Sequence, residues 1–317
     1  KILCVLMSCL LFVMAGCSGH SKNLKFGAAD IGGVYYSFAS TFTQLADKEI
    51  DGYTFETKTT AGSVANLRLI SDGYIDLAIV QADLLSDAYN ATGTFADKKY
   101  QKGYKAVASL YTECCQIVVR KDSGITGIDD LINKTVSVGA SESGSEKNAE
   151  QILKMSGITD ELINKVNMDY TEAAEKLKAG EIDAFFCTAG TKTEVIGQLS
   201  KECDICLISL DDKCIDKMLS AYSLCEKYTI PAGTYNGQDS DVTTIGVKAV
   251  LIAKQSLSDD VIKNVTKTIY EHADDFKYAT SLDISFDINT AADGVDIPFH
   301  SGAAAYYTER GINVLTE

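Results

Sequence analysis

Histidine is scarce in this chain, and the short motifs of several large enzyme classes are missing. The 317 residues include only three histidines, His20, His272 and His300. No G-x-S-x-G, H-E-x-x-H or P-loop motif occurs, and residues 27–33 do not form a dinucleotide-binding fingerprint. The pair Cys203 and Cys206 has the spacing of half a zinc site, but the histidines lie far from it in the sequence. We therefore predict a protein that is not an enzyme and needs no metal or cofactor.

Basic residues are also few. Lys and Arg total 29 against 44 Asp and Glu, which gives a formal net charge of −15. Sequence-independent binding of nucleic acid requires a basic face, so nucleic acid is not an expected partner. An acidic surface suits a soluble protein outside the cell, and we expect a monomer.

The chain has one long apolar run, at its start, and no later run long enough to cross a membrane. Ile2–Ala15 is too short for a permanent membrane span and fits the apolar region of a secretory signal, which we place at residues 1–16. The next residue, Cys17, completes Met14-Ala15-Gly16-Cys17, which resembles a bacterial lipobox and implies lipidation of Cys17. Residues 17–23 would then tether an exported protein to the outer face of the cell membrane.

Seven cysteines follow the lipobox: Cys114, Cys115, Cys187, Cys203, Cys206, Cys214 and Cys225. An exported protein normally pairs its cysteines, but seven is an odd number and their spacing forms no regular framework. We expect free thiols that pack as small apolar residues.

Short apolar runs alternate with amphipathic segments after residue 23. Val34–Glu49 predicts a helix, with Phe38 and Phe42 on one stripe, and Tyr104–Tyr111 and Gln116–Arg120 predict two strands. Ser258–Lys277 predicts a single helix. Alternation of this kind is typical of an α/β protein with parallel-rich sheets.

Two stretches of the sequence share one pattern, which predicts two lobes built alike. In residues 59–83, a helix ends at Gly73, and Asp76 opens an apolar strand that leads to Gln81. In residues 172–190, Gly180, Asp183 and Thr188 take the same places. Asp76 and Asp183 begin their strands, so we expect a capping or solvated role for them. Ligands of open α/β sheets bind at the carboxyl ends of strands, which points to Gln81 and Thr188.

Helix starts supply the other candidate contacts. Gly32 and Gly33, Ser63 and Val64, and Gly144 and Ser145 each stand where a helix begins, and Ser63 is expected to cap its helix. Helix N-termini can bind an anion through backbone N–H groups, although ordinary capping would explain each of these residues alone. Gln81, Asn148 and Thr188 would add side-chain hydrogen bonds, and Asp83 would receive an ammonium group. Either Tyr35 or Tyr36 would face the cleft.

The mature chain resembles the TAXI-type solute-binding subunit of tripartite ATP-independent periplasmic (TRAP) transporters. The matching segments are residues 32–36, 59–70, 76–83, 118–125, 136–153, 181–190 and 229–239. The resemblance implies a two-lobed periplasmic-binding-protein fold of the class II type, with a cleft between the lobes. Residues 24–120 would form lobe one, residues 121–241 lobe two, and residues 242–317 would return to lobe one.

The resemblance further implies that the protein delivers a glutamate-like amino acid or dicarboxylate to a sodium-coupled TRAP permease. The contacts that it implies are Gly33, Tyr35, Ser63, Gln81, Asp83, Gly144, Ser145, Asn148 and Thr188. Arg68 and Arg120 do not provide a convincing arginine clamp, so helix dipoles would replace one. A binding lipoprotein of an ABC importer and a ligand-sensing ectodomain remain alternatives.

Overall fold

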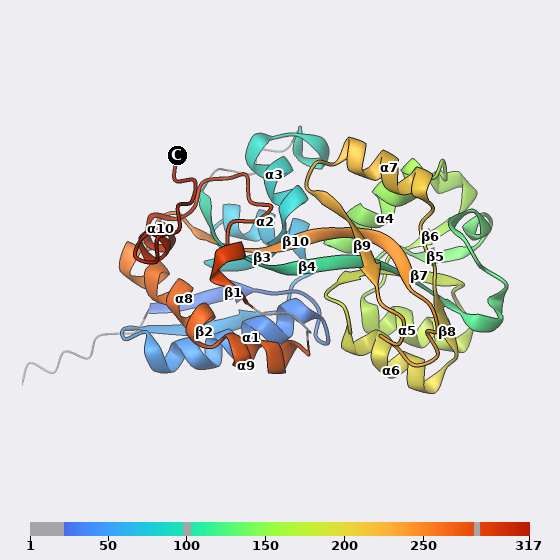
Figure 1. The fold of residues 1–317 in the computed structure, drawn as a ribbon, viewed down its shortest axis with the longest axis horizontal. Coiled ribbons are helices and arrows are strands. Elements are labelled where there is room, and N and C mark those ends of the chain that lie inside the picture. The colour runs from blue at the N-terminus through green and yellow to red at the C-terminus, as the bar shows by residue number, and fades with distance from the viewer. Residues whose placement is uncertain (1–21, 98–102, 282–285) are drawn as a thin grey trace, which may run out of the picture.

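The computed structural model describes residues 22–97, 103–281 and 286–317. The predicted signal segment and Cys17 lie outside these residues. Two lobes lie side by side and are joined by two long strands, β4 and β10 (Figure 1). The elements of the first lobe are β1 (Lys22–Gly27), α1 (Val34–Glu49), β2 (Tyr53–Lys58), α2 (Ser63–Ser71), β3 (Leu77–Gln81), α3 (Ala82–Asn90), α8 (Asp259–Glu271), α9 (Ala273–Thr280) and α10 (Ser301–Thr308).

The second lobe contains most of the middle of the chain. Its elements are β5 (Thr135–Ser137), α4 (Gly144–Met155), β6 (Asn164–Val166), α5 (Tyr170–Ala179), β7 (Ala184–Ala189), α6 (Glu194–Glu202), β8 (Ile205–Leu207), α7 (Asp212–Ala221) and β9 (Cys225–Ile230). The joining strands are β4 (Tyr104–Arg120) and β10 (Val242–Lys254). The α/β prediction is confirmed, and α1 has the predicted bounds.

All strands belong to one ten-stranded sheet in the order β2-β1-β3-β10-β4-β7-β5-β6, with β8 beside β4 and β9 beside β10. Each lobe has three parallel strands, β2-β1-β3 in the first and β6-β5-β7 in the second. Each set is bordered by one antiparallel strand, β10 in the first lobe and β4 in the second. The two lobes therefore have the same strand arrangement.

Helices cover both faces of the sheet in each lobe (Figure 1). Phe38 and Phe42 of α1 are fully buried, as their spacing predicts, and Phe42 packs edge-on against Phe26 with ring centroids 5.5 Å apart. Phe276 of α9 stacks on Phe38 at 4.4 Å. Large buried rings fix α1, and with it the loop that leads into α1, against the sheet.

The structure corrects the sequence predictions in two regions, residues 104–120 and residues 258–277. The predicted strands at 104–111 and 116–120 are one 17-residue strand, because β10 pairs with residues 104–114 of β4 and β7 pairs with residues 114–119. The register of this long pair shifts twice, at Leu110 and at Val107, which are the extra residues of β4 opposite β10. The predicted helix 258–277 is two helices, because His272 leaves helical geometry (φ −114°, ψ 28°) and contacts Glu49 of α1.

The repeated Gly–Asp pattern has the same structural role in both lobes. Gly73 and Gly180 have positive φ angles of 82° and 73° directly after a helix. The Asp76 carboxylate accepts the Lys25 N–H at 2.9 Å, and the Asp183 carboxylate accepts the Thr135 N–H at 2.8 Å. Asp183 therefore caps the first residue of β5, as the capping prediction expects, whereas Asp76 bonds to the middle of β1.

Candidate functional site

The carboxyl ends of β3 and β7 meet at the boundary between the lobes, and a serine hydroxyl holds each end. Ser63 Oγ accepts the Gln81 N–H at 3.1 Å, and Ser145 Oγ accepts the Thr188 N–H at 2.8 Å. Tyr170 adds a hydrogen bond to the Thr188 carbonyl at 2.9 Å. Both serines lie in the first turn of a helix, so each helix start is fixed to a strand end.

The prediction that Ser63 caps α2 is wrong. The N-cap is Gly62, whose φ of 116° is a conformation that favours glycine, and no side chain caps the helix. Ser63 is the first helical residue, and its hydroxyl is bound to Gln81 instead. The corresponding cap of α4 is a side chain, because Ser143 Oγ accepts the Glu146 N–H at 3.0 Å.

The lobes are closed on each other at this boundary. A Cβ atom on Gly144 would lie 2.4 Å from Gln81 Cδ, so only glycine permits this approach. Arg68 of the first lobe forms two hydrogen bonds with the Glu142 carboxylate of the second, at 3.1 and 2.6 Å. The Glu142 carbonyl also accepts the Ala65 N–H of α2 at 3.1 Å. These contacts of Arg68 and Ala65 with Glu142 join the two lobes.

Closure leaves a small cavity of about 30 Å³ between the lobes. One buried water needs about 10–15 Å³ of such space, so this cavity holds about two waters, and a solute of amino-acid size fits only if the lobes or the lining side chains shift. The lining residues are Ala29, Asp30, Gly33, Val34, Tyr35, Ala61, Gly62, Ser63, Gln81, Glu113, Ala140, Ser143, Gly144, Ser145, Tyr170, Thr188 and Ala189.

Seven of the eleven predicted contact residues line this cavity: Gly33, Tyr35, Ser63, Gln81, Gly144, Ser145 and Thr188. The structure brings the N-terminal ends of α1, α2 and α4 together around it. Tyr35 is the tyrosine that faces this cavity, and Tyr36 lines a separate groove.

The remaining four predicted contacts lie elsewhere. Val64 is buried in the core of the first lobe, and Gly32 lines the groove that contains Tyr36. Asp83 and Asn148 are buried between α3 and α4, where both lie beside the Gln151 side chain. Asp83 is the second residue of α3 and Asn148 the fifth of α4, and neither side chain lines the cavity.

Glu113, a buried acidic residue of the cavity, is not among the contacts predicted from the sequence. Its side chain is 3% exposed, comes from the middle of β4, and accepts a hydrogen bond from the Tyr35 hydroxyl at 2.9 Å. Burial raises the pKa of Glu113 to about 8, although hydrogen bonds from Tyr35 and Gln81 act in the opposite direction. The sequence does contain a signal for this contact, because Glu113 is the single charged residue in the mainly apolar stretch 106–119.

Asp30 is the second acidic residue of the cavity that was missed as a contact. It lies in the loop before α1, and its pKa is raised to about 6, first by burial and then by the neighbouring carboxylate of Asp169. The described residues that line the cavity include no Lys, Arg or His. The charged side chains of the site are therefore all carboxyls.

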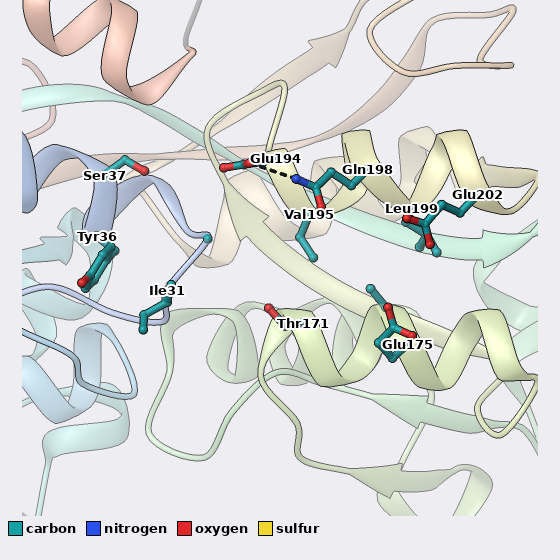
Figure 2. A pocket seen from close by; sticks show the side chains of 12 residues that line it. Ile31, Tyr36, Ser37, Thr171, Glu175, Glu194, Val195, Gln198, Leu199 and Glu202 are labelled. Carbon is teal, nitrogen blue, oxygen red and sulfur yellow. Dashed lines mark hydrogen bonds between the residues drawn. The ribbon is translucent and has the colours of Figure 1, made fainter.

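Two open grooves lie next to the cavity. One, of about 450 Å³, shares Asp30, Ala61 and Ala140 with the cavity, and we call it the mouth groove. The other, of about 420 Å³, runs between the loop at Ile31 and helices α5 and α6 (Figure 2). Figure 2 shows Glu175, Glu194 and Glu202 around this second groove, with Glu194 accepting a hydrogen bond from Gln198 at 3.0 Å.

The cysteines, possible metal-binding groups and possible membrane-spanning helices also bear on the sequence predictions. The seven cysteines are free, and five of them are buried. Within residues 22–97, 103–281 and 286–317, no group of three or more His, Cys, Asp or Glu side chains is arranged to hold a metal. No helix in the same ranges is both long and apolar enough to span a membrane.

The sequence matches the NMT1-like family over residues 26–311. This chain belongs to the NMT1-like family. The match includes both lobes, β4, β10 and every residue that lines the cavity.

Solved structures identify the fold of this NMT1-like protein. The methylphosphonate complex of PhnD1 from Prochlorococcus marinus has a TM-score of 0.59 at 13% identity, over 84% of this chain and 93% of that chain. A putative L-cystine ABC transporter protein from Listeria monocytogenes has a TM-score of 0.52 at 14% identity, over 82% and 94%. An ancestral arginine-binding protein bound to arginine has a TM-score of 0.51 at 15% identity, over 83% and 98%. The fold is the two-lobed fold of periplasmic solute-binding proteins, as expected.

Proposed function

We propose that this NMT1-like protein is an extracytoplasmic solute-binding protein that captures a small polar solute between its lobes and delivers it to a membrane importer. The supporting observation is the meeting of three helix N-termini from both lobes around one cavity. The first turn of each helix has N–H groups without partners in the helix, and these groups bind carboxylates well. A solute held by α1, α2 and α4 together would favour the closed state, because α4 reaches it only when the lobes meet.

For the class of importer, the comparisons favour the ABC alternative over the TRAP permease. The structurally similar protein from Listeria is named as a component of an ABC transporter, and none of the three structures described above is named as a TRAP component. Co-purification with the membrane subunits encoded beside this protein would decide the class. An ATPase among them indicates an ABC importer, and a permease without an ATPase indicates a TRAP system.

Export and lipid anchoring are part of the same proposal. They rest on the apolar run and the Met14-Ala15-Gly16-Cys17 motif, which lie outside the described residues. Delivery to a membrane importer is efficient when the binding protein stays near the membrane, and a short tether after Cys17 would provide this.

The proposal is tested by identifying the solute. Protein purified under native conditions is denatured, and the released small molecules are identified by mass spectrometry. We expect one carboxylate-bearing solute at close to one equivalent per chain, which raises the melting temperature when it is added back. Stabilisation by about 2.7 kcal/mol is expected at a hundredfold excess over Kd. Stabilisation by a partner protein, with no effect of any small solute, would favour the sensing ectodomain instead.

A further inference from the structure

Glu113 lies in the cavity among groups that provide no positive charge. Its titratable neighbours are Tyr35 of α1, Tyr111 and Cys114 of β4, Asp83 of α3, Tyr170 of α5 and Cys187 of β7. All of these groups are acids, so none of them can neutralise an ionised Glu113. A buried carboxylate requires a cationic partner or several donors to stay charged, and the hydrogen bond that the described neighbours give Glu113 comes from the Tyr35 hydroxyl.

Gln81 adds a second acceptor beside Glu113. The Gln81 side chain is 2% exposed, lines the cavity and lies close enough to Glu113 to lower the pKa of that carboxyl. Its Oε1 atom is buried and, among the described residues, has no hydrogen-bond donor. Buried acceptors without donors are rare in proteins, so Gln81 Oε1 indicates a donor on the solute.

The opposite requirement comes from the helix starts. The N-terminal turns of α1, α2 and α4 line the same cavity and present N–H donors and the positive ends of their dipoles. The cavity therefore has two kinds of surface, one that donates to an anion and one, at Glu113 and Gln81, that accepts from a cation.

We propose that the solute is a zwitterion of the α-amino acid type, with its carboxylate at the helix N-termini and its ammonium group on Glu113 and Gln81 Oε1. This inference rests on the proposed function, since it concerns the solute of the same cleft. It assigns Glu113 as the residue that selects an amine-bearing solute over a plain carboxylate. It also moves the ammonium contact from Asp83, where the sequence analysis placed it, to β4.

The mouth groove limits which side chain the solute can carry. Asp30, Asp169 and Glu172 line the mouth groove, and its described lining contains no basic residue. A second carboxylate on the solute would point into this acidic surface. The preferred solute therefore has an uncharged or cationic side chain. This differs from the sequence-based expectation of a glutamate-like amino acid or a dicarboxylate, both of which carry a second carboxylate.

Matched pairs of probes test the ammonium contact. Each pair differs at the amino group. A hydroxyl replaces it in L-lactate against L-alanine and in L-phenyllactate against L-phenylalanine, and a hydrogen replaces it in glutarate against L-glutamate. L-Arginine extends the test to a cationic side chain, and the panel is completed by the remaining amino acids, glucose and methylphosphonate. Binding to the full mature chain is measured by thermal shift and by isothermal titration calorimetry. We expect an amino acid to bind at least tenfold more tightly than its amine-lacking partner, and L-glutamate to bind more weakly than amino acids without a side-chain carboxylate.

The variant Glu113→Gln tests the residue. Glutamine resembles the protonated carboxyl that burial favours at neutral pH, so the variant is expected to fold. A hydrogen bond to a charged group contributes about 1.5–3 kcal/mol, so the preference for the amino acid should fall by roughly tenfold to a hundredfold. This ratio of two affinities does not depend on the fraction of protein that is folded. The control Glu161→Gln removes an exposed carboxylate of the second lobe and should leave the ratio unchanged.

Each outcome has one meaning. Loss of the preference in Glu113→Gln but not in Glu161→Gln supports the inference. Equal binding within the matched pairs, preference for glutarate, binding of only glucose or methylphosphonate, or an unchanged ratio in Glu113→Gln overturns it but leaves a solute-binding protein. If no small molecule co-purifies with the protein and no probe binds, the proposed function fails together with the inference.

Discussion

Substitution of Gly144 by alanine should separate lobe closure from the stability of the fold. The new Cβ would lie 2.4 Å from Gln81 Cδ and Oε1, whereas carbon atoms in contact are about 3.5–4.0 Å apart. The lobes or the Gln81 side chain must then move by about 1 Å or more. Gln81 is buried beside Glu113, so its side chain cannot simply turn into solvent.

The expected cost falls on a closed, solute-bound state in which Gly144 still lies against Gln81, and the open state does not share it. Overpacking of this kind costs roughly 1–3 kcal/mol, which weakens solute binding by about fivefold to 150-fold. The open state has no such clash, and alanine favours a helix over glycine by up to about 1 kcal/mol. Gly144→Ala should therefore bind its solute more weakly while its solute-free melting temperature stays equal or rises.

Calorimetry gives the affinity, and small-angle X-ray scattering at a fixed solute concentration gives the fraction of closed protein. The control Gly197→Ala makes the same change in α6, where a Cβ meets nothing within 4 Å, and should leave binding unchanged. In a Gln81→Ala background, Gly144→Ala should cost little, because its collision partner is gone. Affinity of Gly144→Ala within twofold of the parent, or equal cost in both backgrounds, would refute the reasoning.

Three further predictions concern other parts of the molecule. Arg68→Ala removes the partly exposed ion pair with Glu142, so solute affinity should fall by no more than about fivefold, corresponding to about 1 kcal/mol; titration in 1 M salt should abolish the difference. Burial raises the pKa of Glu113 to about 8, and an ammonium-bearing solute needs the ionised carboxyl, so binding releases a proton. Affinity should therefore rise by up to about tenfold per pH unit from pH 6 to pH 8 and then level off, and a pH-independent affinity would contradict the ammonium contact. Cys17→Ala should give an exported protein that leaves the membrane fraction on washing, and its retention there would count against lipidation.

The repeated Gly–Asp pattern could be found from the sequence because its causes are local. Gly73 and Gly180 end their helices through positive φ angles, and only a few residue types accept that conformation. The hydrogen bonds of Asp76 and Asp183 are not local, because they reach Lys25 and Thr135, 51 and 48 residues earlier in the chain. The same spacing of glycine, aspartate and apolar residues therefore predicts the same turn wherever it occurs in the chain.

The helix starts show how far such local signals reach. Residues at Gly33, Ser63 and Gly144 were correctly expected at helix beginnings, because a change of hydrophobic period marks these boundaries. The direction of each side chain was not available from the pattern. Asp83 and Asn148 lie one helical turn or less from cavity residues, but they face α4 and α3 instead of the cavity.

The sequence by itself determined the α/β class, the two similar lobes and the bounds of α1, since these depend on periodicity and on glycine at turns. Only the tertiary structure decided that β4 is a single strand through both lobes, because strand length there is fixed by pairing with β10 and β7, far along the chain. That pairing places Glu113 in the cavity. Its burial, its raised pKa and the absence of basic side chains from the described lining follow from packing between residues distant in sequence, which no local pattern encodes.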